Sequence, residues 1–201
     1  MPNIYKKNDF DIAGFCVGIM EKKDLLPKNN IIEKDCIIGI KSNGFHSNGY
    51  SLINNMINKN KIKTNDIVEK KNIGSELIKP TKIYTDILKI KSFKKIKAIA
   101  NITGGGLTEN IPRILPENKS AQIDFKKIKM NKIFSYIQDK GNIDTREMLR
   151  VFNCGIGMTL IVNCKDAESI IQELKKMKLS SHVIGDIISK RGKPVVTYTN
   201  I

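Results

Sequence analysis

Residues 36–60 read CIIGIKSNGFHSNGYSLINNMINKN, and the order of patterns within this stretch decides the fold class. Residues 36–42 are a short apolar run that stops at a glycine-rich turn, which is typical of a buried strand. Residues 49–60 then place their apolar side chains at helical spacing. Ser47 or Asn48 is the predicted N-cap, because short polar side chains satisfy the first free N–H groups of a helix. The stretch therefore predicts a strand, a loop and a helix.

The same order recurs further along the chain. Residues 98–102 are apolar and lead into TGGG (103–106), after which residues 108–116 predict a short helix with Thr108 as its N-cap. Apolar runs predict further strands at residues 10–20, 120–125, 158–163, 182–188 and 194–199. Helical periodicity predicts further helices at residues 74–91 (interrupted by Pro80), 131–141, 145–152 and 166–178. Alternating strands and helices without an internal repeat predict an α/β fold.

Length and composition narrow the class of protein. At 201 residues the chain can bury a real core. No run approaches about 18 apolar residues, so no membrane span is predicted. The N-terminus lacks the basic segment and apolar core of a secretory signal. The cysteines show no C-x-x-C spacing, so we expect no zinc site and reduced thiols in a cytoplasmic protein.

A formal net charge of +15 raises nucleic acid as a partner. Two observations disfavour it. Only four of the 35 basic residues are arginine, whose planar fork reads bases and phosphates. The lysines are scattered over every segment, and they accompany many isoleucines and asparagines, which share AT-rich codons. We therefore expect no surface that binds nucleic acid, and we attribute the positive net charge to an AT-rich genome.

The first candidate loop is SNGFHSNGYS (42–51). Glycines such as Gly49 let backbone N–H groups turn toward a ligand, and Ser47 and Asn48 add side-chain donors. His46 exchanges a proton near neutral pH. The alternative is a tight turn between strand and helix that carries a solvent-exposed histidine.

The second candidate loop is NITGGGLTEN (101–110). Thr103, Gly104, Gly105 and Gly106 lie between a predicted strand and a predicted helix, which suits a phosphate cradle. The loop matches neither G-x-x-x-x-G-K-[ST] nor G-x-G-x-x-G. An irregular turn without a ligand is the alternative.

The third candidate loop is RVFNCGIGM (150–158). Cys154 is a possible nucleophile, but no base stands next to it in sequence, so a packed thiol is the favoured interpretation. Asn153 is expected to orient a polar group.

Taken together, the loops resemble one family. SNGFHSNGYSL (42–52), PTKIY (80–84), ITGGGLTENIPRILP (102–116) and EMLRVFNCGIGM (147–158) are similar to the C-terminal half of aminoimidazole ribonucleotide synthetase, also called phosphoribosylformylglycinamidine cyclo-ligase. The similarity runs in order over essentially the whole chain. It implies an α/β fold with a mixed sheet flanked by helices. It also implies a ligase of purine biosynthesis.

The resemblance implies ATP-dependent closure of formylglycinamidine ribonucleotide to aminoimidazole ribonucleotide, with ATP and Mg²⁺ in the complete enzyme. His46 and Asn153 are the implied catalytic residues. The implied substrate and phosphate contacts are Ser47, Asn48, Gly49, Thr103, Gly104, Gly105 and Gly106, and no metal ligand is implied in this chain. Two departures from the family motifs stand out: Asn101 occupies a position that is usually histidine, and Lys82 one that is usually arginine. Asparagine carries no proton at neutral pH, and lysine cannot make a bidentate contact.

The same resemblance suggests a division of the chain. Residues 1–30 are expected to be a remnant of an N-terminal ATP-binding domain, and residues 31–201 the C-terminal α/β domain. Met1 aligns inside a motif of the family, so we expect a truncated or split protein that is inactive alone. One interpretation is that it works with a separately encoded N-terminal half; the alternatives are a product of gene decay or a misplaced start. The complete enzyme would be a homodimer.

Two rival functions stay open. One is another ATP-using member of the same superfamily, such as the amidotransferase of the preceding step or selenophosphate synthetase; HSNGYS and FNCGIGM disfavour it. The other is a non-catalytic nucleotide- or RNA-binding module that exploits the positive charge.

Overall fold

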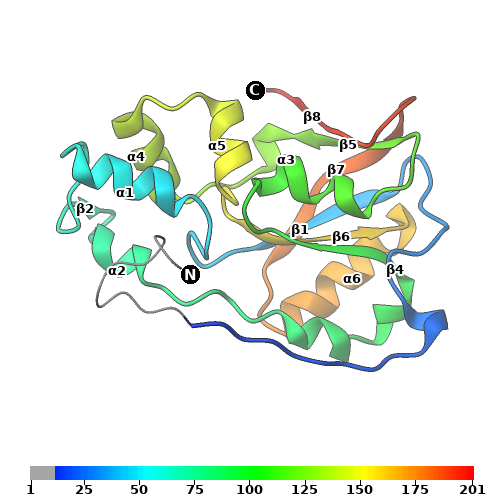
Figure 1. The fold of residues 1–201 in the computed structure, drawn as a ribbon. Coiled ribbons are helices and arrows are strands. Elements are labelled where there is room, and N and C mark those ends of the chain that lie inside the picture. Colours follow the sequence, from blue (N-terminus) through cyan, green and yellow to red (C-terminus); the bar gives the residue numbers. More distant parts are fainter. Residues whose placement is uncertain (1–11) are drawn as a thin grey trace, which may run out of the picture.

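The apolar runs of the sequence form one mixed sheet in the computed structural model, which describes residues 12–201. Within those residues the sheet has six strands in the order β4-β6-β1-β7-β5-β8 (Figure 1). Its strands are β1 (Cys36–Lys41), β4 (Ile96–Asn101), β5 (Lys119–Asp124), β6 (Ile156–Val162), β7 (Ser181–Ser189) and β8 (Val196–Thr199). Neighbouring strands are antiparallel except β5 and β8, which are parallel. A separate hairpin joins β2 (Ile67–Val68) to β3 (Lys71–Asn72).

Helices cover both faces of this sheet, as Figure 1 shows. The α-helices are α1 (Tyr50–Asn58), α2 (Ile73–Leu77), α3 (Gly106–Asn110), α4 (Lys132–Gly141), α5 (Thr145–Val151) and α6 (Cys164–Lys176). Short 3-10 helices are η1 (Lys22–Asp24), η2 (Thr85–Lys89), η3 (Lys91–Lys95), η4 (Pro112–Ile114) and η5 (Phe125–Lys127). The prediction of an α/β fold with a mixed sheet flanked by helices is confirmed.

Strand β1 explains why residues 36–42 read as an almost continuous apolar run. Ile37 packs into a core with helices α1, α3, α4 and α5, whereas Ile38 and Ile40 pack into a second core with α6, η2 and η3. A strand that is buried on both faces shows no alternation of polar and apolar side chains. The sheet is thus the wall between two hydrophobic cores.

Two helices begin at glycines and not at the predicted polar caps. Gly49, with φ 76°, precedes α1, and Gly105, with φ 97°, precedes α3. Neither Ser47 nor Asn48 caps α1, and α3 begins two residues before Thr108. These predictions were wrong because glycine enters the left-handed conformation without steric cost, and the loops use that freedom to turn sharply.

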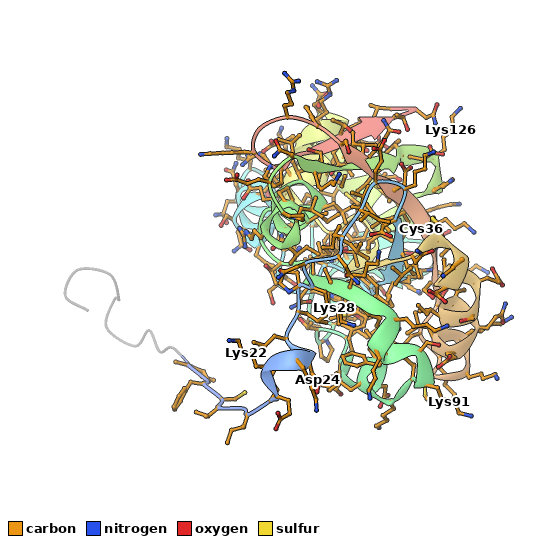
Figure 2. All side chains as sticks on the ribbon, turned by 90° about the vertical axis from the view of Figure 1, so that its right-hand side faces the viewer. Lys22, Asp24, Lys28, Cys36, Lys91 and Lys126 are labelled. Atoms are coloured by element: carbon orange, nitrogen blue, oxygen red, sulfur yellow. A yellow bond between two sulfur atoms is a disulfide. The ribbon has the colours of Figure 1, made fainter. Side chains whose placement is uncertain are left out.

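The strand predicted at residues 10–20 is absent from the part that the structure describes. Residues 12–20 form no strand, and Phe15, Val17 and Ile19 are 92%, 80% and 100% exposed. Figure 2 shows Lys22 and Asp24 on the segment that extends from the body of the molecule. The first three residues, on which the expectation of an internal methionine rests, lie outside the described residues, and the division at residue 30 stays a prediction.

A buried ion pair attaches the segment before β1 to the sheet. Asp35 is 1% exposed, and its Oδ1 and Oδ2 lie 2.7 Å and 2.8 Å from Lys97 Nζ on β4. Lys97 Nζ also donates to the carbonyl of Asn30, at 3.0 Å. Removing one partner would leave the other charge buried and unpaired, which costs about 3–5 kcal/mol.

The start of β1 is also joined to α6 by a disulfide. Cys36 and Cys164 are bonded, with their Cα atoms 4.9 Å apart. The pairing follows from the sheet, because Cys36 lies opposite Val162 on β6 and the chain enters α6 two residues later. The prediction of reduced thiols was wrong for this pair. Cys16 and Cys154 are the free thiols among the described residues.

We expect Cys36→Ser to lower the free energy of unfolding by about 2–4 kcal/mol, because the bond closes a loop of 128 residues in the unfolded chain. Urea unfolding in buffer without a reductant measures the change. Cys16→Ser is the matched control; its thiol is exposed and free, so the change should stay within about 0.5 kcal/mol. Equal stabilities of Cys36→Ser and the parent chain would contradict the prediction.

Candidate functional site

The three loops predicted from the sequence lie together at one end of the sheet. Strands β4, β6 and β1 are neighbours, and β6 runs antiparallel to the other two. The loops that follow β1 and β4 and the loop that precedes β6 therefore meet at the same end of the strands (Figure 1). Residues 42–49, 102–105 and 152–155 form this candidate site.

Asn153 holds the first and third loops to each other. Its Nδ2 donates to the carbonyls of Gly44 and Phe45 at 2.9 Å and 3.0 Å. Its Oδ1 accepts from Gly155 N at 2.8 Å and from Ser42 Oγ at 3.2 Å. The residue is fully buried. Because both ends of the amide are engaged inside the loops, the contacts favour a positioning role over the direct catalytic role that the resemblance implied.

Asn48 ties the first loop to the second. Its Nδ2 donates to the carbonyl of Thr103 at 2.9 Å, and the residue is 1% exposed. Ser47 beside it is exposed, as are Thr103 and Gly104 across the contact. Of the predicted substrate contacts, these three therefore have the most accessible positions.

Asn110 at the end of α3 organises the second loop and was missed from the sequence. Its Nδ2 donates to the carbonyls of Thr103, Gly104 and Gly106 at 3.2, 3.1 and 2.8 Å. Its Oδ1 accepts from Thr103 Oγ1 at 3.2 Å. The signal available was an asparagine four residues after a run of glycines, which is too common to single out.

The four glycines predicted to contact substrate or phosphate differ in why each is a glycine. A Cβ on Gly49 would lie 2.0 Å from a ring carbon of Phe152, and one on Gly106 would lie 2.2 Å from the carbonyl oxygen of Leu149. A Cβ on Gly105 would lie 2.6 Å from the Glu109 carboxylate. Gly104, by contrast, has no atom within 4 Å of such a Cβ. Packing explains three of the four, and Gly104 faces open space.

His46 lies inside the site and is only 7% exposed, so the alternative of a solvent-exposed histidine is wrong. It has a φ of 55°, a conformation uncommon outside glycine. Burial, and then the positive charge of Lys82, lower its pKa from the ordinary 6.5. The imidazole is therefore neutral at neutral pH and able to accept a proton.

Residues of the PTKIY segment form the wall beside this histidine. The rings of His46 and Tyr84 are 6.1 Å apart, and Tyr84 Oη donates to the carbonyl of Lys41 at 3.1 Å. A Cβ on Gly157 would lie 2.0 Å from Tyr84 Oη and 2.7 Å from His46 Cε1, so glycine is needed there. An apolar groove of about 440 Å³ continues outward past Lys82, Tyr84 and the exposed Asn101.

Cys154 is a packed thiol, which confirms the interpretation favoured from the sequence. It is fully buried, its Sγ donates to the carbonyl of Met148 at 3.3 Å, and burial raises its pKa to about 12. A thiol that stays protonated is a poor nucleophile.

Basic side chains are spread over the molecule. Figure 2 shows Lys22, Lys28, Lys91 and Lys126 on separate parts of the surface. Among residues 12–201, no three His, Cys, Asp or Glu side chains come together in a way that could hold a metal ion. In the same part of the chain, every helix is too short or too polar to cross a membrane.

Sequence comparison matches most of the chain to one family. Residues 33–197 match the family described as AIR synthase related protein, C-terminal domain. The phosphoribosylformylglycinamidine cyclo-ligase of Syntrophus aciditrophicus (strain SB) is 43% identical over 204 residues. The match covers 99% of this chain and 59% of that enzyme, so the chain spans little more than half of its relative's length.

Solved structures share the fold at low sequence identity. Thiamine-monophosphate kinase from Stenotrophomonas maltophilia K279a has a TM-score of 0.57 and 13% identity, covering 83% of this chain and 51% of that chain. T. maritima PurL complexed with AMPPCP has a TM-score of 0.52 and 11% identity, covering 89% of this chain and 25% of that chain. At such identities the likeness shows the fold alone.

Gly106, where a side chain would clash with the backbone, and Gly104, where it would meet open space, give a matched pair of variants. Gly106→Ala should lower the free energy of unfolding by at least about 2 kcal/mol, because φ is 56° and the new Cβ meets backbone oxygen. Gly104→Ala should change it by no more than about 0.5 kcal/mol, since nothing lies near. Urea unfolding of both variants is the measurement, and similar losses in the two would contradict the packing.

The lowered pKa of His46 predicts a loss of stability in acid. The unfolded chain takes up a proton near pH 6.5 while folded His46 does not, so the free energy of unfolding falls as the pH drops below about 6.5. His46→Gln should make this fall shallower between pH 7 and pH 5. NMR titration of the His46 ring gives a direct check, and a midpoint at or above 6.5 would contradict the burial argument.

Proposed function

The chain belongs to the AIR synthase related family, and from that premise we propose that it acts as the C-terminal part of a phosphoribosylformylglycinamidine cyclo-ligase. The complete enzyme would convert formylglycinamidine ribonucleotide and ATP to aminoimidazole ribonucleotide, ADP and phosphate, a step of purine biosynthesis. The observation that carries the proposal is the convergence of three loops around a buried, neutral histidine, in a chain 43% identical to such an enzyme.

The second loop supports a phosphate site for the substrate. The Asn110 amide draws the carbonyls of Thr103, Gly104 and Gly106 inward, away from the solvent side of the loop. Carbonyl oxygens repel phosphate, so turning them inward favours an anion on the outer side. Gly104 leaves that side open, and the exposed hydroxyl of Ser47 is held nearby by the contact between Asn48 and Thr103.

His46 supplies the proton chemistry of the proposed reaction. ATP would transfer its terminal phosphoryl group to the formyl oxygen of the substrate. A substrate nitrogen would then attack the formyl carbon, phosphate would leave with the oxygen, and the nitrogen would lose a proton. A neutral imidazole is suited to accept that proton. Asn153 would act by holding the carbonyls of Gly44 and Phe45, and so the residue before His46, in place.

ATP and Mg²⁺ belong to the proposed complete enzyme. The described residues do not fit a resident Mg²⁺, because they contain no cluster of acidic side chains or histidines that could hold one. No step is therefore assigned to the metal on this chain. We propose that an ATP-binding half, in the same or a separate polypeptide, completes the site, and that the complete enzyme is a cytoplasmic homodimer.

Reconstitution tests the function. The chain is mixed with the N-terminal part of the Syntrophus aciditrophicus cyclo-ligase, and ATP-dependent formation of aminoimidazole ribonucleotide is measured. His46→Ala should lower kcat by about 10²- to 10⁴-fold, the range of one general base. His182→Ala is the matched control, because this second histidine lies on β7 and its Nε2 contacts the carbonyl of Lys127.

Two further outcomes decide against the proposal. An unchanged rate in His46→Ala would remove the histidine from the mechanism. Cyclisation by residues 1–201 without any other polypeptide would refute the assignment of ATP binding to a half outside these residues. Binding of formylglycinamidine ribonucleotide to the chain alone, followed by NMR, gives a readout that does not depend on turnover.

A further inference from the structure

Asn43 lies beside His46, and no role was predicted for Asn43 from the sequence. Asn43 Oδ1 lies 2.8 Å from His46 Nε2. Two backbone N–H groups, those of Asn43 and Lys82, lie 3.4 Å from the same nitrogen. The short contact and the two long ones call for opposite states of Nε2, because an oxygen acceptor needs a proton on that nitrogen and an N–H group needs a lone pair.

The orientation of the Asn43 amide decides between these states. Asn43 Nδ2 lies 3.0 Å from the carbonyl of Pro80, which can only accept a hydrogen bond. The NH₂ end of the amide therefore faces Pro80, and the oxygen end faces His46. With an oxygen at 2.8 Å, an unprotonated Nε2 would oppose two lone pairs, whereas contacts at 3.4 Å are at the weak limit of a hydrogen bond.

We propose that Asn43 is a positioning residue that holds His46 in the Nε2–H tautomer and leaves Nδ1 as the nitrogen that accepts a proton. Among residues 12–201, no hydrogen bond reaches Nδ1. When Nδ1 takes a proton, Nε2–H continues to donate to Asn43 Oδ1, so the same bond orients the ring before and after the transfer. The use of this proton in catalysis rests on the proposed function, whereas the tautomer does not.

An amide at this position also has a different effect from a carboxylate. The positive charge of Lys82, on the PTKIY segment, lowers the pKa of the His46 ring, and Lys41 at the end of β1 in turn lowers the pKa of Lys82. Neutral Asn43 adds no negative charge, so the ring stays neutral and ready to accept a proton. An aspartate would keep the acceptor but favour the protonated imidazolium.

The test uses the chain labelled with ¹⁵N-histidine and needs no substrate. Long-range ¹H–¹⁵N spectra separate pyrrole-type from pyridine-type nitrogens, and His182→Gln identifies the signals of His46. We expect Nε2 to be pyrrole-type and Nδ1 pyridine-type at pH 8. A wild-type ring protonated at Nδ1 would overturn the proposal.

Two variants separate the contact with His46 from the contact with Pro80. Asn43→Ala loses both, and we expect a mixture of tautomers. Asn43→Asp cannot donate to Pro80 but keeps an acceptor, so it should retain the Nε2–H tautomer and raise the titration midpoint of His46 by about one pH unit or more. An unchanged ring in Asn43→Ala, or loss of the tautomer in Asn43→Asp, would also overturn the proposal.

The reconstituted enzyme then tests the catalytic consequence. Asn43→Ala should lower kcat by about tenfold or more with KM nearly unchanged, and Asn43→Asp should move the acid limb of the pH profile upward. An unchanged kcat in Asn43→Ala, despite the mixed tautomers, would refute the positioning role. If the wild-type assembly makes no product, the proposed function fails, and the tautomer is still decided by the spectra.

Discussion

The buried amide of Asn153 is the contact on which the candidate site depends. The first loop turns the carbonyls of Gly44 and Phe45 toward the protein interior, where an unpaired carbonyl is costly. Asn153 pairs both of them, and its oxygen satisfies Gly155 N. Aromatic packing reinforces this polar centre, since the Phe45 ring lies 4.7 Å from that of Phe134 and 5.7 Å from that of Phe152.

The packing of the first loop fixes the position of His46, because His46 directly follows the buried Phe45. Phe45 is buried by the aromatic cluster, and the following residue, His46, takes a left-handed backbone that returns its ring toward Asn43. A general base works only when its ring is held in one orientation and one tautomer. A second buried asparagine, Asn110, holds the second loop in the same way, by donating hydrogen bonds to its backbone carbonyls. Both walls of the site are therefore built by buried amides that hydrogen-bond to the backbone of the loops.

The sequence predicted the features that depend on residues close together in the chain. Apolar runs located the strands, and glycine clusters located the three loops, because burial and left-handed turns leave compositional marks. It was insufficient where partners are distant. Cys36 and Cys164 pair only because β1 and β6 are adjacent in a particular register, which spacing cannot reveal. The burial of His46 and the contact from Asn43 to Pro80 likewise depend on how loops from different strands meet. Residues 10–20 were predicted as a strand because they are apolar, but a strand also needs a neighbouring strand to pair with, and residues 12–20 form no strand.

The bond between Cys36 and Cys164 has a consequence for the integrity of the chain. It closes a covalent ring, and all three loops of the site lie inside that ring. Backbone cleavage at any one point between the two cysteines, including within an exposed stretch such as residues 63–65, would leave both fragments attached to each other. The site would then stay assembled on a nicked chain for as long as the sulfurs remain bonded. Limited proteolysis would show the cut only after reduction.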